Sequence, residues 1–196
     1  MARQDAKNAK ERPGDETGKL LAKHPCGLLG SRTNMSVVPT DSGAVAVRRP
    51  TARDWPRMRE ILETVNYHRI GGAEMPDFPL ELCFVAELDG RIAGLAGYRL
   101  LNRTKAKTTL MAVDPACRGR GIGLLLQQAR MDFLRARGLR FLYTNCDEEG
   151  VIDWYARHFG YQRTGRRVPK VEPFGLPDRH EWITLVCTLH PESAHD

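Results

Sequence analysis

The stretch from Val113 to Arg130, VDPACRGRGIGLLLQQAR, constrains the fold most strongly because three glycines stand directly before an apolar helix pattern. Glycine inside a helix costs about 1 kcal/mol relative to alanine, so three at a helix entrance indicate that another group approaches the backbone closely. The first amide N–H groups of a helix have no intrahelical partner, and the helix dipole adds partial positive charge there. The stretch therefore predicts an anion-binding turn between a strand and a helix.

Two common phosphate-binding loops do not fit this stretch. A P-loop needs Lys followed by Ser or Thr after its last glycine, whereas Leu124 and Leu125 follow Gly123. A dinucleotide-binding loop has the pattern G-x-G-x-x-G, whereas the glycines here are spaced G-x-G-x-G. Both loops are therefore excluded at the residues that would contact the ligand.

Strand and helix patterns alternate along the rest of the chain. Period-two and helical spacings of apolar residues, the Asp89-Gly90 hairpin dipeptide and an N-cap at Thr51 or Asp54 define the expected elements. The order is β-α-β-β-β-α-β-α-β-β, which predicts an α/β fold with a mixed sheet flanked by helices. Strands are expected at 44–50, twice within 82–101, and at 106–113, 139–145, 161–168 and 181–189, with helices at 51–70, from the glycine turn to about 137, and at 151–159.

Composition divides the chain into one domain and two tails. The 196 residues are 41% apolar and 28% charged, which suits one globular domain of roughly 150 residues. Residues 1–34 hold seven Lys or Arg and four Asp or Glu, so half of the net charge of +6 lies in a polar segment with no aromatic residue. We therefore expect a disordered N-terminal tail over 1–43, a domain over 44–190 and a C-terminal tail over 191–196.

The cysteine pattern and the hydropathy predict a cytoplasmic protein. Five cysteines are odd in number, widely spaced and never form a CxxC pair, which is typical of a reduced protein without a disulfide framework or a zinc site. No apolar run approaches the roughly 18 residues that a membrane span needs, and the N-terminus lacks the apolar core of a secretory signal. We therefore expect neither a membrane partner nor a metal.

Three motifs resemble those of the GCN5-related N-acetyltransferase (GNAT) family. They are the signature Arg/Gln-x-x-Gly-x-Gly/Ala, a V-x-P sequence just before it, and an aromatic-Tyr pair followed by FGY. These motifs are met by Arg118, Gly121 and Gly123, by Val113 and Pro115, and by Trp154-Tyr155. The order of elements is also similar, so the resemblance covers roughly residues 45–190. It implies a mixed, mostly antiparallel sheet that is flanked by helices and splayed at the acetyl-CoA site.

The resemblance implies acetyl-CoA as the cosubstrate. In such enzymes the loop amides hold the pyrophosphate, and the pantetheine arm pairs like an extra strand with the strand before the loop, where a backbone N–H can polarise the thioester carbonyl. The cofactor-binding residues expected on this basis are Met111, Ala112, Val113, Arg118, Gly119, Arg120, Gly121, Ile122, Gly123 and Leu124.

The resemblance also implies that Tyr155 is the proton donor, because the family commonly keeps a tyrosine there near the CoA sulfur. With an ordinary pKa of about 10, its hydroxyl stays protonated at neutral pH. Many members have a glutamate that acts as the general base near the start of the strand before the loop, whereas Lys107 stands near that place here. Glu148 is the candidate base instead, directly or through water, although an acidic cluster before a helix also stabilises the helix dipole. Cys146 offers an acyl-cysteine route, for which a buried inert cysteine is the competing interpretation.

The implied activity is transfer of an acetyl group to a primary amine of a small, amino-acid-like molecule by direct attack. Acidic residues on one loop and basic residues on the last hairpin would suit a zwitterionic acceptor, and ordinary solvated loops explain them equally well. These residues are Glu74, Asp77 and Glu81, and Arg166, Arg167, Lys170, Arg179 and His180.

Other functions stay open alongside this activity. The first is acetylation of a protein amine, and the second is a non-catalytic CoA-binding sensor domain, against which Tyr155 argues. Nucleic-acid binding ranks last because no aromatic platform with interleaved basic residues is present. A homodimer is compatible with the sequence.

Overall fold

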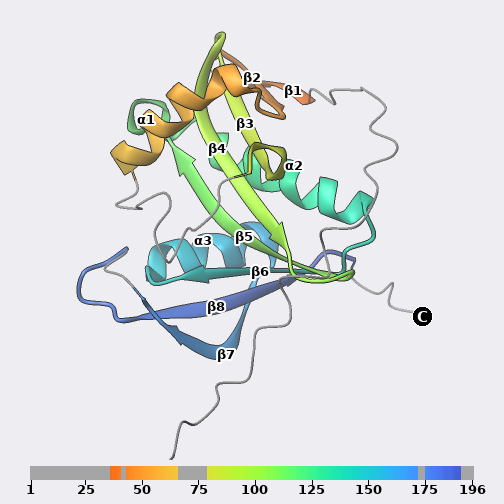
Figure 1. Cartoon of the computed structure of the whole chain (residues 1–196), viewed down its shortest axis with the longest axis vertical. Coiled ribbons are helices and arrows are strands. Elements are labelled where there is room, and N and C mark those ends of the chain that lie inside the picture. Colours follow the sequence, from red (N-terminus) through yellow and green to blue (C-terminus); the bar gives the residue numbers. More distant parts are fainter. Residues whose placement is uncertain (1–35, 41–42, 66–78, 172–174, 191–196) are drawn as a thin grey trace, which may run out of the picture. The chain divides into compact units, whose positions relative to one another are not determined.

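The computed structural model describes residues 36–40, 43–65, 79–171 and 175–190. The described residues contain eight strands and three α-helices in the expected order, with one additional strand at the start (Figure 1). The elements are β1 (Ser36–Thr40), β2 (Gly43–Arg48), α1 (Trp55–Val65), β3 (Cys83–Leu88), β4 (Arg91–Leu100), β5 (Lys105–Val113), α2 (Ile122–Ala136), β6 (Phe141–Cys146), α3 (Glu149–Phe159), β7 (Gln162–Pro169) and β8 (Glu181–Thr188). The expected C-terminal tail and most of the expected N-terminal tail lie outside the described residues.

All eight strands belong to one sheet in the order β1-β2-β3-β4-β5-β6-β8-β7. Neighbouring strands are antiparallel except β5 and β6, which are parallel. The predicted mixed, mostly antiparallel sheet flanked by helices is therefore confirmed. Among the described residues, no helix is long and apolar enough to cross a membrane.

Strand β1 corrects the end of the expected N-terminal tail, because it lies within residues 1–43. It pairs with β2 across a two-residue connection, with Thr40 opposite Gly43. Val37 and Val38 are β-branched and favour a strand, and Pro39 is tolerated because β1 is an edge strand that needs no further ladder partner. The composition of residues 1–43 as a whole does not indicate this short hairpin.

Helices α1 and α2 cover opposite faces of the sheet, since successive residues of β3 alternate between a core that contains α1 residues and a core that contains α2 residues. The first face packs against α1, and the second packs against both α2 and α3. The first core contains Met58, Ile61, Leu62, Cys83, Val85, Leu95 and Leu110. The second core contains Phe84, Ala86, Ala96, Ile122, Leu126, Leu134, Ile152 and Tyr155.

The sheet opens between the two parallel strands. Strands β5 and β6 pair only where residues 105–107 face residues 141–143, and they then separate toward the end at which α3 begins (Figure 1). Just beyond the last backbone pair, the hydroxyls of Thr108 and Thr144 are 2.5 Å apart and bridge the two strands. Beyond this apex the β6-facing edge of β5 pairs with no other strand of the described residues, as the family resemblance implied.

Candidate active site

The exit of β5 is held by a set of hydrogen bonds around Asp114. The Asp114 amide donates to the Ala93 carbonyl (2.9 Å), and its carboxylate accepts from the Ala116 amide (2.9 Å) and pairs with Arg57. The Cys117 amide then donates to the Asp114 carbonyl (2.8 Å), which closes a 3-10 turn. The V-D-P sequence thus fixes the direction in which the chain enters the glycine turn.

The glycine turn requires glycine for its backbone conformation. Gly119 and Gly121 have φ angles of +78° and +74°, in the left-handed region that favours glycine. A Cβ atom at either position would meet no described atom within 4 Å, so the turn borders open space. Gly121 is the N-cap of α2, and the first amides of this helix have no intrahelical acceptor. The turn can therefore present N–H groups to an anion in that open space.

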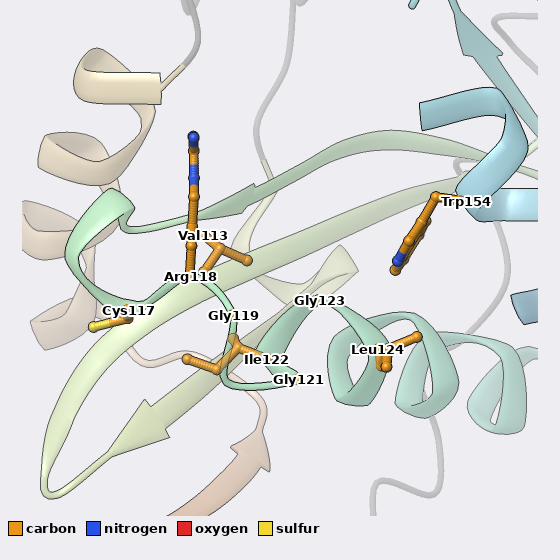
Figure 2. A pocket seen from close by; sticks show the side chains of 9 residues that line it. All are labelled: Val113, Cys117, Arg118, Gly119, Gly121, Ile122, Gly123, Leu124 and Trp154. Carbon is orange, nitrogen blue, oxygen red and sulfur yellow. The ribbon is translucent and has the colours of Figure 1, made fainter. Parts of the chain in front are cut away.

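A cavity of about 300 Å³ lies where the end of β5, the glycine turn and α3 meet. Figure 2 shows Trp154 reaching from α3 toward the first turn of α2. A Cβ on Gly123 would lie 3.8 Å from the Trp154 ring, so the two elements are in close proximity there. The cavity is lined by Val113, Cys117, Arg118, Gly119, Gly121, Ile122, Gly123, Leu124 and Trp154 (Figure 2).

Most of the predicted cofactor-binding residues meet at this cavity. Met111, Ala112 and Arg120 are the three that do not line it, and Ala112 is buried in the α1-facing core. Cys117 and Trp154 line the cavity although sequence reasoning did not name them as binding residues. Trp154 belongs to the aromatic-Tyr pair, and this pair was a signal that could have identified it.

Tyr155 is buried beneath the cavity-lining tryptophan and retains only 5% of its exposure. Its ring makes edge-to-face contacts with Trp154 (centroids 5.0 Å apart) and Tyr161 (4.9 Å). Burial is the largest influence on its hydroxyl and raises the pKa of Tyr155, whereas the side chains of Arg130 and Thr144 act on the hydroxyl and lower its pKa. The hydroxyl therefore stays protonated at neutral pH.

Asp147, the first acid of the predicted cluster at 147–149, is engaged in a buried ion pair. Its carboxylate lies 2.5 Å from the Lys170 ammonium and accepts from the Leu176 amide (2.7 Å), and the two charged side chains are 9% and 5% exposed. The Lys170 ammonium also lies 4.6 Å from the centre of the Trp182 ring. These contacts join the segment between β7 and β8 to the end of β6.

Asp147→Asn is expected to lower the free energy of unfolding by about 3–5 kcal/mol, because it leaves the buried ammonium of Lys170 without its counterion. Urea denaturation measures this change. Glu63→Gln is the matched control: it breaks the exposed Arg59–Glu63 pair (2.7 Å) and should cost at most about 0.5 kcal/mol. Equal losses for the two variants would contradict a stabilising role for the buried pair.

The other two acids of the cluster differ in environment. Glu149 lies in the first turn of α3 and pairs with Arg163. Glu148 is the exposed N-cap residue of α3, and its carbonyl accepts from the amides of Val151 and Ile152. Within the described part of the chain, Glu148 is the member of the cluster whose carboxylate has no ion-pair partner.

The basic side of the expected acceptor site is only partly available. Lys170 is committed to its buried partner, and Arg167 lies 3.4 Å from Glu181. Glu74 and Asp77 lie outside the described residues.

The thiol of Cys146 is buried, and burial raises its pKa, so it stays protonated and is a poor nucleophile. This environment favours the interpretation of Cys146 as an inert cysteine.

A glycine turn at a helix N-terminus, beside an opened and mostly antiparallel sheet, is the arrangement of an acetyltransferase-like fold. Residues 52–161 match the acetyltransferase (GNAT) family, and the chain belongs to that family of acyl-CoA-dependent transferases.

Comparison with individual proteins gives the same family. The chain is 36% identical to N-alpha-acetyltransferase RimI of Mycobacterium tuberculosis over 85 residues. The aligned segment covers 42% of this chain and 52% of the relative. The chain spans about half the length of the curated relatives it matches. Its fold is similar to yncA of Salmonella typhimurium with its cofactor acetyl-CoA (TM-score 0.59, 17% identity, 78% of this chain and 98% of that one). It is also similar to N-acetylglutamate synthase of Neisseria gonorrhoeae complexed with coenzyme A and N-acetyl-glutamate (TM-score 0.55, 22% identity). This match covers 75% of this chain and 35% of that one.

Proposed function

We propose that the protein transfers an acetyl group from acetyl-CoA to a primary amine, with a small, amino-acid-like molecule as the acceptor. The observation that carries this proposal is the cavity between the glycine turn and Trp154, at the open end of the split between β5 and β6. Membership of the acetyltransferase family supports the reaction class. The similarity to N-acetylglutamate synthase supports an amino-acid-like acceptor.

The glycine turn fits the pyrophosphate of acetyl-CoA. Open space borders Gly119 and Gly121, and the adjoining helix N-terminus supplies unpaired N–H groups and positive potential. Arg118 is exposed at the rim of the same cavity and adds a cation. An anion can therefore contact the backbone here without displacing a side chain.

The open edge of β5 fits the pantetheine arm. Beyond Lys107 no strand in the described part of the chain pairs with this edge, so an extended ligand can pair with the backbone as far as Val113. A thioester placed toward the apex would then lie near Thr144 and the hydroxyl of Tyr155. This arrangement leaves the proton donor at the closed end of the opening and the pyrophosphate site at the other end.

The reaction then follows from the groups at the opening. A neutral amine attacks the thioester carbonyl, and the carbon–sulfur bond breaks as the carbonyl re-forms. Tyr155 gives its proton to the departing sulfur, and Glu148 accepts the proton of the amine directly or through water. Because both roles belong to the chain's own side chains, each can be tested by a single substitution.

Acetylation of a protein amine is the second candidate. The similarity to N-alpha-acetyltransferase RimI favours it, because that name specifies an α-amine. A free amino acid and a polypeptide N-terminus share this reacting group. They differ in size, because a polypeptide needs an entrance that also admits the rest of its chain. A non-catalytic CoA-binding domain is the third alternative, and the protonated hydroxyl of Tyr155 argues against it.

An acceptor screen tests the proposal. The protein is incubated with acetyl-CoA and with amino acids, polyamines, aminoglycosides or short peptides, and release of the CoA thiol is followed. We expect amino acids to accelerate thiol release above the background without acceptor. Release with peptides alone would favour the second candidate, and acetyl-CoA binding without release for any acceptor would favour the sensor domain.

A further inference from the structure

Arg130 is a buried cation that has no role in the reaction proposed above. It lies on the inner face of α2 with 0% of its surface exposed. Its Nη1 donates to the carbonyls of Gly97 (2.9 Å) and Leu110 (3.0 Å), and its Nη2 donates to the side-chain oxygen of Gln127. Within the described residues it forms no ion pair with a carboxylate, and its Nε has no hydrogen-bond partner. The positive charge is therefore held by neutral groups alone.

A bulge in the sheet explains how the fold accommodates this guanidinium. The pairing of β4 with β5 shifts between Gly97 and Tyr98, so that Gly97 faces Leu110 while Tyr98 faces Thr108. Such a shift disrupts the ladder locally, and here the carbonyls of Gly97 and Leu110 accept from Arg130. Gly97 also has no room for a side chain, because a Cβ would lie 2.5 Å from the Thr109 hydroxyl.

Arg130 belongs to a polar network at the apex where β5 and β6 separate. Its partner Gln127 donates to the Tyr161 hydroxyl (3.0 Å), and the Tyr161 ring packs against the Tyr155 ring with centroids 4.9 Å apart. Thr144, which like Arg130 lowers the pKa of Tyr155, contacts Thr108 across the split. The network therefore joins α2, α3, β5 and β6 at the point to which the thioester is assigned.

We propose that Arg130 is a positioning residue that acts through Tyr155: its buried guanidinium stabilises the phenolate that Tyr155 becomes when it protonates the CoA sulfur. This inference rests on the proposed function, in which Tyr155 is the proton donor. In that step the carbon–sulfur bond breaks and its electron pair goes to sulfur. The proton moves from the Tyr155 oxygen to the sulfur, which leaves free CoA thiol and a phenolate beside the guanidinium. The phenolate regains a proton from solvent before the next turnover.

Groups from several elements act on the Tyr155 phenol. Burial raises its pKa most strongly, and the nearby Cys146 of β6 also raises it. Arg130 of α2 and Thr144 of β6 lower it, and the ring of Tyr161 packs against it. Arg130 thus offsets part of the cost of forming a buried phenolate, and removing its charge should raise the pKa of Tyr155 further.

A titration without any ligand tests this coupling directly. A fluorinated tyrosine, whose phenol is more acidic than that of tyrosine, is incorporated at position 155, and its ¹⁹F chemical shift is followed against pH. Arg130→Met should raise the titration midpoint by about one pH unit or more, because it removes a neighbouring cation. Arg130→Lys keeps the charge and should stay near the wild-type midpoint. Gln127→Leu, which removes a neutral member of the network, should do the same.

Kinetics test whether the coupling serves the reaction, with the acceptor that releases thiol fastest in the screen. Arg130→Met should lower kcat about tenfold or more with the KM for acetyl-CoA within about threefold, and it should have no further effect in a Tyr155→Phe background. If Arg130→Met does not fold, Arg130→Gln replaces it in both measurements.

Two outcomes would overturn the inference. One is an unchanged titration midpoint in Arg130→Met. The other is a kcat loss that is the same with and without the Tyr155 hydroxyl, which is the result expected of a merely structural residue. A wild-type protein that acetylates no acceptor would contradict the proposed function instead, and the ligand-free titration would still report on the Arg130 and Tyr155 pair.

Discussion

Tyr155→Phe is expected to lower kcat by about 10²- to 10⁴-fold while the affinity for acetyl-CoA changes by no more than about threefold. The substitution removes the hydroxyl and keeps the ring, which packs edge-to-face against Trp154 and Tyr161. Because burial raises the pKa of Tyr155, its hydroxyl carries a proton at neutral pH and can donate it to the departing sulfur. Steady-state kinetics measure kcat, and calorimetry measures acetyl-CoA affinity.

Tyr161→Phe is the matched control for this variant. It removes a second buried hydroxyl of the same aromatic cluster, which accepts a hydrogen bond from Gln127 (3.0 Å). We expect a comparable change in melting temperature and a kcat near the wild-type value. If Tyr155→Phe leaves both kcat and affinity within about threefold of the wild type, the thiolate departs without this hydroxyl, and Tyr155 is a core aromatic residue only.

Gly121→Glu is expected to abolish acetyl-CoA binding. The new carboxylate would enter the open space beside the glycine turn, where it would repel the pyrophosphate and occupy its place. The left-handed φ of +74° also strains any side chain at this position by about 1–2 kcal/mol, so some loss of stability accompanies the loss of binding. Calorimetry measures the affinity, and circular dichroism shows whether the fold persists.

Gly138→Glu separates the strain from the loss of the anion site. Gly138 follows the other end of α2, has a φ of +76°, and would place its Cβ where no described atom lies within 4 Å. The two variants therefore carry the same backbone strain and the same new charge. We expect Gly138→Glu to bind acetyl-CoA like the wild type. Equal affinities for both variants would show that the glycine turn is not the pyrophosphate site.

Local sequence patterns were sufficient to predict every element of this fold from β2 onward. The glycine turn between Val113 and Ile122 could be located because glycine at a left-handed φ is a property of the residue itself. Hairpin and helix signals placed β3, β4, α2 and α3 for the same reason, since turn chemistry and apolar periodicity act over a few residues. Strand β1 was missed because a short edge hairpin with a proline carries a weak signal of this kind.

The site could be predicted only in part. Motif spacing indicated the residues of the turn, most of which line the cavity, but it did not indicate that Trp154 faces the cavity while Tyr155 points into the core. Neighbouring positions on a helix face different directions, and which of them faces a cavity depends on how the helix packs. The α3 helix packs with Tyr155 inward.

The sequence by itself determined the order of the elements from β2 onward, the glycine turn and the family, because these depend on local conformation and on motif spacing. Only the tertiary structure decided the partners of the charges. It pairs Asp147 with Lys170 and leaves Glu148 exposed, although three acids stand side by side in the sequence. It also buries Arg130 against two carbonyls beside a bulge. The physical reason is that a buried charge needs polar partners, and folding brings some of these partners from segments that are distant in the sequence.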